Sequence, residues 1–220
     1  MLDRCLLYYI TDRTQFRGDE GARRRALLIK VAEAARAGVD YIQLREKDLS
    51  TRKLETLARE VVAVLRENIR ENSPSTRLLI NSRIDVALAA GADGVHLRAD
   101  DVTPDAVRRV LDVPIHRPAD HFIVAVSCHT VADVFHAESE KADFAVFAPV
   151  FGKDGAPGTQ PAGLTALRQA CRAKIGVIAL GGVNLENAVS CLKAGAGGIA
   201  GIRLFQENKI EDVVGTLQTL

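Results

Sequence analysis

The stretch Tyr41-Ile42-Gln43-Leu44-Arg45-Glu46-Lys47 decides the fold and places the site. In an extended chain, alternate side chains point to opposite faces. One face then carries Tyr41, Gln43, Arg45 and Lys47, and the other carries Ile42 and Leu44. A row of amide, guanidinium and ammonium donors suits a phosphorylated or otherwise anionic ligand. The alternative is a charged strand end in which Arg45 and Lys47 pair with Glu46 or Asp48.

The residues just before this stretch form a pattern that recurs along the chain. Each copy places a small or glycine helix end directly before a strand. The copies are Arg36-Ala37-Gly38-Val39-Asp40-Tyr41, Ala89-Ala90-Gly91-Ala92-Asp93-Gly94, Lys141-Ala142-Asp143-Phe144 and Lys193-Ala194-Gly195-Ala196-Gly197-Gly198. Glycine adopts the positive φ angle that ends a helix. The pattern predicts the repeated helix-to-strand turn of an α/β barrel.

Short apolar runs alternate with longer amphipathic segments over the whole chain. The predicted strands are 6–10, 41–44, 78–80, 94–97, 122–126, 144–148, 177–180 and 198–202. The predicted helices are 22–37, 51–71, 84–90, 104–111, 131–140, 164–173, 184–194 and 210–220. This alternation predicts a single domain over residues 1–220, a (β/α)8 TIM barrel with eight parallel strands. The alternative, an open doubly wound sheet, is disfavoured because Thr11-Asp12-Arg13 replaces a glycine-rich turn after the first strand.

Composition excludes several classes of function. The 220 residues are 47% hydrophobic and carry a net charge of +1, which does not indicate a nucleic-acid-binding protein. No apolar run is long enough to span a membrane, and the start of the chain lacks the apolar region of a signal peptide, so we expect a cytoplasmic protein. The cysteines, Cys5, Cys128, Cys171 and Cys191, are too widely spaced to indicate a zinc site or a disulfide framework.

The carboxyl ends of the predicted strands carry most of the polar groups, and this is the face where TIM barrels place their chemistry. Gly181-Gly182-Val183-Asn184 runs from strand seven into a predicted helix, and Gly201 follows strand eight. Backbone N–H groups at such turns bind phosphate, so we expect a phosphate site here. Further polar groups at this face are Asn81, Ser82, His96, Asp100, Asp101, Ser127, His129 and Arg203.

Three of these residues have alternative interpretations. Asp101 supplies a carboxylate for Mg²⁺, which takes one or two carboxylates together with phosphate oxygens and water. Asp101 also precedes Thr103-Pro104, a typical helix start, so capping that helix is the alternative. Ser127 and His129 share one face of a strand, which allows a hydrogen bond between them. No nucleophile elbow accompanies them, so we reject a hydrolase triad, and His129 is a candidate general acid or base.

Six motifs resemble one known family, in the same order and over nearly the whole chain. They are Leu7-Tyr8-Tyr9-Ile10-Thr11-Asp12-Arg13, Gln43-x-Arg45-x-Lys47, Leu79-Ile80-Asn81, Gly91-Ala92-Asp93-Gly94-Val95-His96-Leu97, Val126-Ser127-x-His129-Thr130 and Ala179-x-Gly181-Gly182-Val183. The chain is identified as a member of the family that contains thiamine phosphate synthase and the TenI-like thiazole tautomerase.

The resemblance implies an enzyme that joins hydroxymethylpyrimidine diphosphate to thiazole phosphate and releases pyrophosphate. It implies that the diphosphate is held by Gln43, Arg45, Lys47 and Asn81. It further implies that Asp101 binds Mg²⁺, that Ser127 lies beside the reacting pyrimidine, and that Gly182 holds the thiazole phosphate. Among the polar groups, Lys47, Ser127 and His129 are the catalytic candidates. The expected partners are these small phosphorylated substrates, with a homo-oligomer left open.

The chain departs from the synthase pattern at several positions. Ser82 replaces an expected magnesium-binding Asp, Arg203 replaces an expected Ser, and Arg98-Ala99 replaces Gly-Gln. The loop 149–155 lacks the usual Pro-Thr-x-Thr-Lys sequence. These departures favour the tautomerase, a metal-free proton transfer that relies on a histidine matching His129, or a barrel that binds phosphate without catalysis. The complete donor row and Asp101 favour the synthase, which is our preferred interpretation. In this interpretation Lys153 and Arg203 compensate in part for the lost loop donors and the lost carboxylate.

Overall fold

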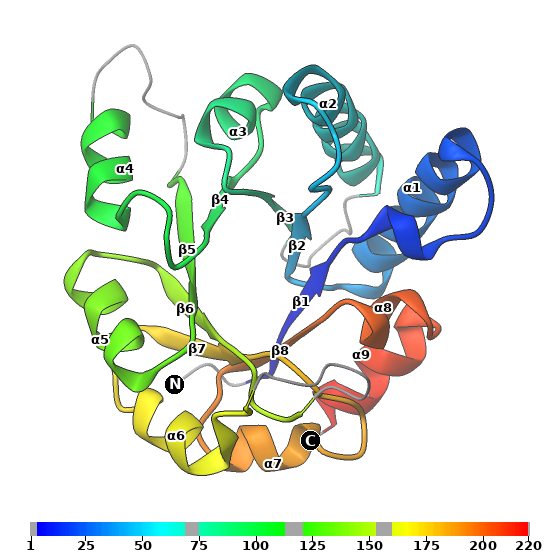
Figure 1. The fold of residues 1–220 in the computed structure, drawn as a ribbon. Coiled ribbons are helices and arrows are strands. Elements are labelled where there is room, and N and C mark those ends of the chain that lie inside the picture. Colours follow the sequence, from blue (N-terminus) through cyan, green and yellow to red (C-terminus); the bar gives the residue numbers. More distant parts are fainter. Residues whose placement is uncertain (1–3, 69–74, 113–120, 153–159, 220) are drawn as a thin grey trace.

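The chain folds into a closed parallel barrel surrounded by helices (Figure 1). A computed structural model describes residues 4–68, 75–112, 121–152 and 160–219. The strands follow one another around the barrel in sequence order, and β1 closes it by pairing in parallel with β8. The predicted TIM barrel is therefore confirmed. A single domain over residues 1–220 stays a prediction.

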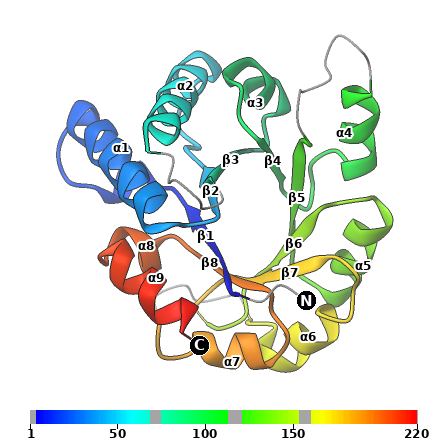
Figure 2. The same cartoon turned by 180° about the vertical axis from the view of Figure 1, so that it is seen from behind.

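The strands agree with the predicted ones to within one or two residues at each end. They are β1 (Leu6–Ile10), β2 (Tyr41–Leu44), β3 (Arg77–Asn81), β4 (Gly94–Leu97), β5 (Ile123–Cys128), β6 (Phe144–Phe147), β7 (Gly176–Ala179) and β8 (Gly198–Gly201). Figure 2 shows the strands from behind, enclosed by the same ring of helices.

The helices of the described chain bury one apolar stripe each against the strands. They are α1 (Glu20–Ala37), α2 (Thr51–Glu67), α3 (Ile84–Ala90), α4 (Pro104–Leu111), α5 (Val131–Ser139), α6 (Gly163–Ala170), α7 (Ala188–Lys193), α8 (Arg203–Gln206) and α9 (Ile210–Gln218). In α2, the buried residues recur every three or four positions, from Leu54 to Leu65. Thr103 caps α4 by accepting from Ala106 N, as the sequence predicted.

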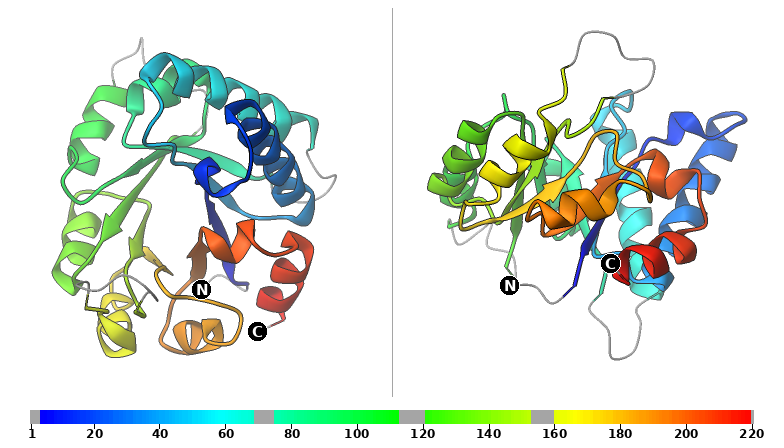
Figure 3. Two further views of the ribbon diagram at one scale, coloured as in Figure 1. Left: turned by 45° about the vertical axis from the view of Figure 1, so that its right-hand side comes forward. Right: turned by 90° about the horizontal axis from the view of Figure 1, so that it is seen from below.

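Several helices differ from the prediction. The helices predicted over 51–71 and 164–173 end earlier, at Glu67 and Ala170. The helix predicted over 184–194 begins only at Ala188, because the Asn184 side chain accepts hydrogen bonds from the backbone of Glu186 and Asn187 and holds a turn there. The short helix α8 and the 3-10 turn η1 (Arg13–Gln15) were not predicted. In Figure 3, α8 and α9 follow β8 at the side of the barrel where α1 lies, and α9 contacts α1.

The repeated helix-to-strand turns hold the amino ends of the strands together. Gly38, Gly91 and Gly195 have φ angles of 88°, 69° and 103°, which confirms that glycine supplies the positive φ angle at these helix ends. Lys141 adopts the same conformation, with a φ of 65°.

The aspartate in three of these turns accepts a hydrogen bond from the preceding strand. Asp40 accepts from Leu7 N at 2.8 Å, Asp93 from Leu78 N at 2.7 Å, and Asp143 from Val124 N at 2.6 Å. Each aspartate also pairs with an arginine, namely Arg4, Arg77 and Arg108 in turn. Each aspartate therefore ties the strand that it precedes to the neighbouring strand.

The core is divided by the barrel wall. Alternate strand residues fill the barrel interior, among them Tyr8, Leu79, Phe144 and Ile178. The other set, which includes Ile42 and Leu44, packs under the helices as the alternation in β2 predicted. None of the helices in the described ranges is long and apolar enough to cross a membrane.

Candidate active site

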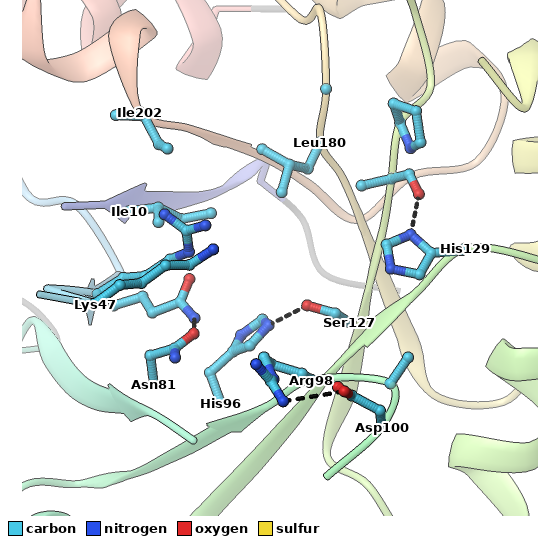
Figure 4. A pocket seen from close by; sticks show the side chains of 16 residues that line it. Ile10, Lys47, Asn81, His96, Arg98, Asp100, Ser127, His129, Leu180 and Ile202 are labelled. Carbon is cyan, nitrogen blue, oxygen red and sulfur yellow. Dashed lines mark hydrogen bonds and ion pairs between the residues drawn. The ribbon is translucent and has the colours of Figure 1, made fainter. Parts of the chain in front are cut away.

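A cavity of about 720 Å³ opens at the carboxyl ends of the strands (Figure 4). In Figure 4, Lys47, His96 and His129 approach it from different sides, and Ile10, Leu180 and Ile202 form its apolar wall. The remaining lining residues are Gln43, Arg45, Asn81, Arg98, Ala99, Asp100, Ser127, Ala148, Pro149 and Gly181. Most of the side chains singled out in the sequence therefore surround one space.

The donor row of the second strand reaches this cavity. β2 ends at Leu44, yet the alternation continues, so that Gln43, Arg45 and Lys47 all line the cavity. No ion pair of Arg45 is found within the described ranges. The pairing of Arg45 with Glu46 or Asp48, the alternative weighed from the sequence, is therefore wrong.

Glu46 and Asp48 instead bind Arg13, the residue that follows β1 by three positions. The Arg13 guanidinium donates to Glu46 at 3.1 Å and to Asp48 at 2.7 and 2.8 Å. It also donates to Glu20 at 2.9 and 3.1 Å. The hydrogen bonds to Asp48, followed by those to Glu20 and Glu46, raise the pKa of Arg13 above its usual range. The side chains of Arg13 and Glu46 are only 3% and 1% exposed. This cluster fixes the carboxylates behind the strand and keeps Arg45 and Lys47 on the cavity side.

Asn81, at the end of β3, extends the donor row. Its Oδ1 accepts from Gln43 Nε2 at 3.0 Å, and its Nδ2 donates to the hydroxyl of Ser82 at 3.2 Å. Ser82 has a φ of 59°, a left-handed conformation that is uncommon for serine. Its hydroxyl donates to Asp101 Oδ2 at 2.6 Å. Ser82, which stands where the synthase pattern has an aspartate, is therefore hydrogen-bonded to Asp101, the other carboxylate of that pattern.

Asp101 closes the turn after β4. Its Oδ2 accepts from Arg98 N at 2.7 Å, and its Oδ1 lies 3.5 Å from Arg98 Nε. Thr103 caps α4, so the alternative in which Asp101 caps this helix is wrong. Arg98 also pairs with Asp100 at 3.0 Å and reaches the cavity. Within the described ranges, no group of three or more His, Cys, Asp or Glu side chains is placed to hold a metal.

Ser127 lies on the cavity side of β5, and Cys128 is buried on the other side, as predicted. The hydrogen bond between Ser127 and His129 that the sequence allowed does not form. Ser127 Oγ instead lies 2.8 Å from Nε2 of His96, which is on the neighbouring strand β4 (Figure 4). Burial, followed by the charge of Arg45, lowers the pKa of His96 to about 3, so its imidazole is neutral.

His129 follows β5 and is exposed to the cavity. Its Nδ1 lies 2.7 Å from the carbonyl oxygen of Ala148. A carbonyl only accepts, so Nδ1 carries a proton and donates it. In the neutral ring, Nε2 is then the basic nitrogen.

A second cavity of about 540 Å³ adjoins the first and shares Leu180, Gly181 and Ile202 with it. Gly182 and Arg203 also line it. Gly181 and Gly182 have φ angles of 93° and 65°, and a Cβ on either would lie 2.6 or 2.5 Å from the backbone of the loop after β6. Both positions therefore require glycine. The predicted helix start at Asn184 is wrong, so the N–H groups here belong to a loop and not to a helix end. The polar side chains that line this cavity are those of Arg203, Gln15, Asn184, Asn208, Glu186 and Glu207.

Comparison with known proteins decides the family. A family model described as thiamine monophosphate synthase matches residues 7–205. The chain belongs to the thiamine monophosphate synthase family. The chain is 40% identical to the putative thiamine-phosphate synthase 2 of Aquifex aeolicus, over 91% of this chain and 97% of that protein. It is 36% identical to the thiamine-phosphate synthase of Clostridium novyi, over 97% and 96% of the two chains.

A solved thiamine phosphate pyrophosphorylase from Pyrococcus furiosus superimposes on the chain with a TM-score of 0.76 at 29% identity, covering 97% of this chain and 94% of that one. The family resemblance and the preferred synthase interpretation are thus confirmed by relatives of the thiamine monophosphate synthase family.

The sequence missed part of the site. His96 was placed at this face without a role, and Tyr8 and Arg98 were not assigned to the site, although His96 and Arg98 line the cavity and Tyr8 binds His96. The signal for His96 was its position on the same inward face of the barrel as Tyr8. Lys153, proposed to compensate for lost loop donors, and most of the 151–163 loop lie outside the described residues.

Proposed function

We propose that this chain joins hydroxymethylpyrimidine diphosphate to thiazole phosphate and releases pyrophosphate, as a transferase of thiamine biosynthesis. Two adjoining cavities at one barrel face carry this proposal, since one holds a cationic donor row and the other a glycine turn with Arg203. The substrate with a diphosphate occupies the first cavity, and the thiazole phosphate occupies the second. The relatives named as synthases and the structural similarity support the assignment.

The chemistry follows from where charge develops. The bond between the pyrimidine methylene carbon and the diphosphate oxygen breaks, and its electron pair leaves with pyrophosphate. The thiazole nitrogen then forms a bond to that carbon. Arg45 and Lys47 stabilise the growing negative charge, and Gln43 and Asn81 orient the diphosphate. Ser127 lies on the other side of the cavity and contacts the pyrimidine.

Asp101 would supply a single carboxylate to Mg²⁺ from the turn after β4, where Asp100 and not Asp101 lines the cavity. Both oxygens of Asp101 face Arg98 or Ser82, so the ion would obtain most of its ligands from the diphosphate and water. When bound, Mg²⁺ neutralises charge on the leaving group. Ser82 supplies a hydroxyl where a second carboxylate would bind the ion more strongly, so the magnesium site in this proposal is a weak one.

The test is to incubate the protein with both substrates and Mg²⁺ and to measure thiamine phosphate and pyrophosphate. Formation of both above a heat-killed control supports the synthase. Arg45→Ala should lower kcat by about 100-fold, because one preformed donor to the leaving group is lost. Arg59→Ala, which changes an exposed arginine of α2, is the matched control and should leave the rate unchanged. Absence of product from the unmodified protein contradicts the proposal.

A second candidate function is thiazole tautomerisation by His129. The hydrogen bond to Ala148 favours it, since it directs the basic Nε2 away from the backbone and leaves that nitrogen able to move a proton. This reaction would proceed with metal removed by chelation, and His129→Ala would abolish it. Unchanged isomerisation in His129→Ala excludes the role of His129. A third candidate, a barrel that only binds phosphate, predicts calorimetric binding of thiazole phosphate with no turnover of either kind.

A further inference from the structure

Tyr8 points into the barrel interior, and its hydroxyl has one partner within the described ranges. The residue is fully buried, and its ring packs edge-on against Tyr41 and Phe144, with centroids 5.8 Å away in both cases. The hydroxyl oxygen lies 2.9 Å from His96 Nδ1. A buried hydroxyl that donates to nothing costs free energy, so the Tyr8 proton goes to Nδ1.

This contact decides where the His96 proton lies. A neutral imidazole has one N–H and one accepting nitrogen, and the hydrogen bond that one nitrogen makes determines the state of the other. Because Nδ1 accepts from Tyr8, Nε2 carries the proton. That N–H then donates to Ser127 Oγ over 2.8 Å.

We propose that Tyr8 holds His96 in the Nε2–H tautomer, and that this tautomer makes Ser127 a hydrogen-bond donor toward the ligand in the cavity. Ser127 Oγ already accepts from His96, and no other acceptor for its proton is found in the part of the chain that the structure describes. With the opposite tautomer, the Ser127 proton would point to His96, and only lone pairs would face the cavity. Tyr8 and His96 are positioning residues, and Ser127 is the group that contacts the ligand.

The donor character of Ser127 restricts the ligand. The atom that meets Ser127 must be a hydrogen-bond acceptor, and a ring nitrogen of an aminopyrimidine meets this requirement. The identity of this ligand rests on the proposed function. The tautomer of His96 does not, because it follows from contacts within the protein alone.

The experiment is a nuclear magnetic resonance measurement of the His96 tautomer in the full-length protein with isotope-labelled histidine, near neutral pH. Correlations between ring protons and ring nitrogens distinguish the two neutral tautomers and the imidazolium. The sequence has 5 histidines, and the His96 signals are those that disappear in His96→Gln. We expect the Nε2–H pattern alone. A pattern of the Nδ1–H tautomer or of the imidazolium overturns the proposal, whatever the enzymatic activity.

Tyr8→Phe tests whether the Tyr8 hydroxyl holds His96 in the Nε2–H tautomer, and Tyr9→Phe is its matched control. Tyr9 is the next residue on β1, is equally buried, and its hydroxyl has no partner in the described chain. Tyr8→Phe should produce a second His96 tautomer and lower kcat/KM for the pyrimidine diphosphate by roughly threefold to tenfold, the value of one neutral hydrogen bond. Tyr9→Phe should change neither. A single Nε2–H pattern retained in a folded Tyr8→Phe protein overturns the role of Tyr8. An Nε2–H pattern in an unmodified protein that makes no thiamine phosphate supports the tautomer and contradicts the synthase.

Discussion

The buried guanidinium of Arg13 lies 3.1 Å from the carboxylate of Glu46, and this contact holds the donor row of strand two in place. Glu46 also accepts from Arg13 N at 3.0 Å and from the Thr11 hydroxyl at 2.6 Å, and Thr11 Oγ1 in turn accepts from Arg45 N at 3.0 Å. The loop after β1 therefore fixes the backbone that carries Arg45 and Lys47. Charges placed in advance need no reorganisation when negative charge develops on a leaving group.

Glu46→Gln should destabilise the protein and weaken pyrophosphate binding. The substitution keeps the shape but removes the buried carboxylate, which leaves Arg13 with Glu20 and Asp48, both 56% exposed. We expect a loss of about 2 kcal/mol in the free energy of unfolding by urea, and calorimetry should show weaker binding of pyrophosphate. Glu55→Gln, in a surface pair of α2, is the control and should cost at most about 0.5 kcal/mol. An equal loss of unfolding free energy in the two variants would show that the buried Arg13–Glu46 pair contributes no more to stability than a surface pair.

Ser82→Asp should strengthen the magnesium site. Asp tolerates the left-handed backbone at φ 59° as well as Ser does, so the change adds no backbone strain. A second carboxylate next to Asp101 should lower the melting temperature without metal through like-charge repulsion. Mg²⁺ should restore it, and calorimetric titration with Mg²⁺ and pyrophosphate should show tighter binding by about tenfold. A melting temperature that does not respond to Mg²⁺ in the variant would place the metal elsewhere.

Tyr9→Phe should stabilise the protein or leave its stability unchanged, whereas Tyr8→Phe should destabilise it. The Tyr9 ring packs against Phe205 at 5.7 Å, and its buried hydroxyl has no partner within the described residues, so its removal relieves a desolvation cost of about 1 kcal/mol. Removing the Tyr8 hydroxyl instead leaves His96 Nδ1 without its donor. The midpoints of urea unfolding measure both effects, and a drop for Tyr9→Phe as large as that for Tyr8→Phe would contradict this account.

His96 should make the protein less stable as the pH falls below 6.5. Burial lowers the pKa of His96 from 6.5 to about 3 in the folded chain, so between these values the unfolded chain binds a proton that the folded chain does not. Acidification therefore favours unfolding, with a slope of about 1.4 kcal/mol per pH unit from this group alone. In His96→Gln, the slope between these pH values should be smaller by about this amount. Identical slopes in the two proteins would mean that His96 titrates normally.

Most of the fold and the polar rim of the site follow from local patterns. Glycine at helix ends predicts turns because of its φ angles, as Gly38 and Gly91 show. Alternation within one strand predicts that Gln43, Arg45 and Lys47 share a face, because successive side chains of an extended chain point to opposite sides. These properties depend on neighbours in the chain, and the sequence alone determines them.

The partners of the polar groups depend on the tertiary structure. Arg13 and Glu46, Ser82 and Asp101, and Tyr8 and His96 are far apart in sequence and meet only when the barrel closes in its observed register. The sequence allowed a hydrogen bond between Ser127 and His129 because they share one face of a strand, whereas barrel closure places His96 beside Ser127. The sequence determined which chemical groups reach the carboxyl ends of the strands. Closure of the barrel decided which of them share a proton, since a hydrogen bond requires a separation of about 3 Å that chain proximity does not specify.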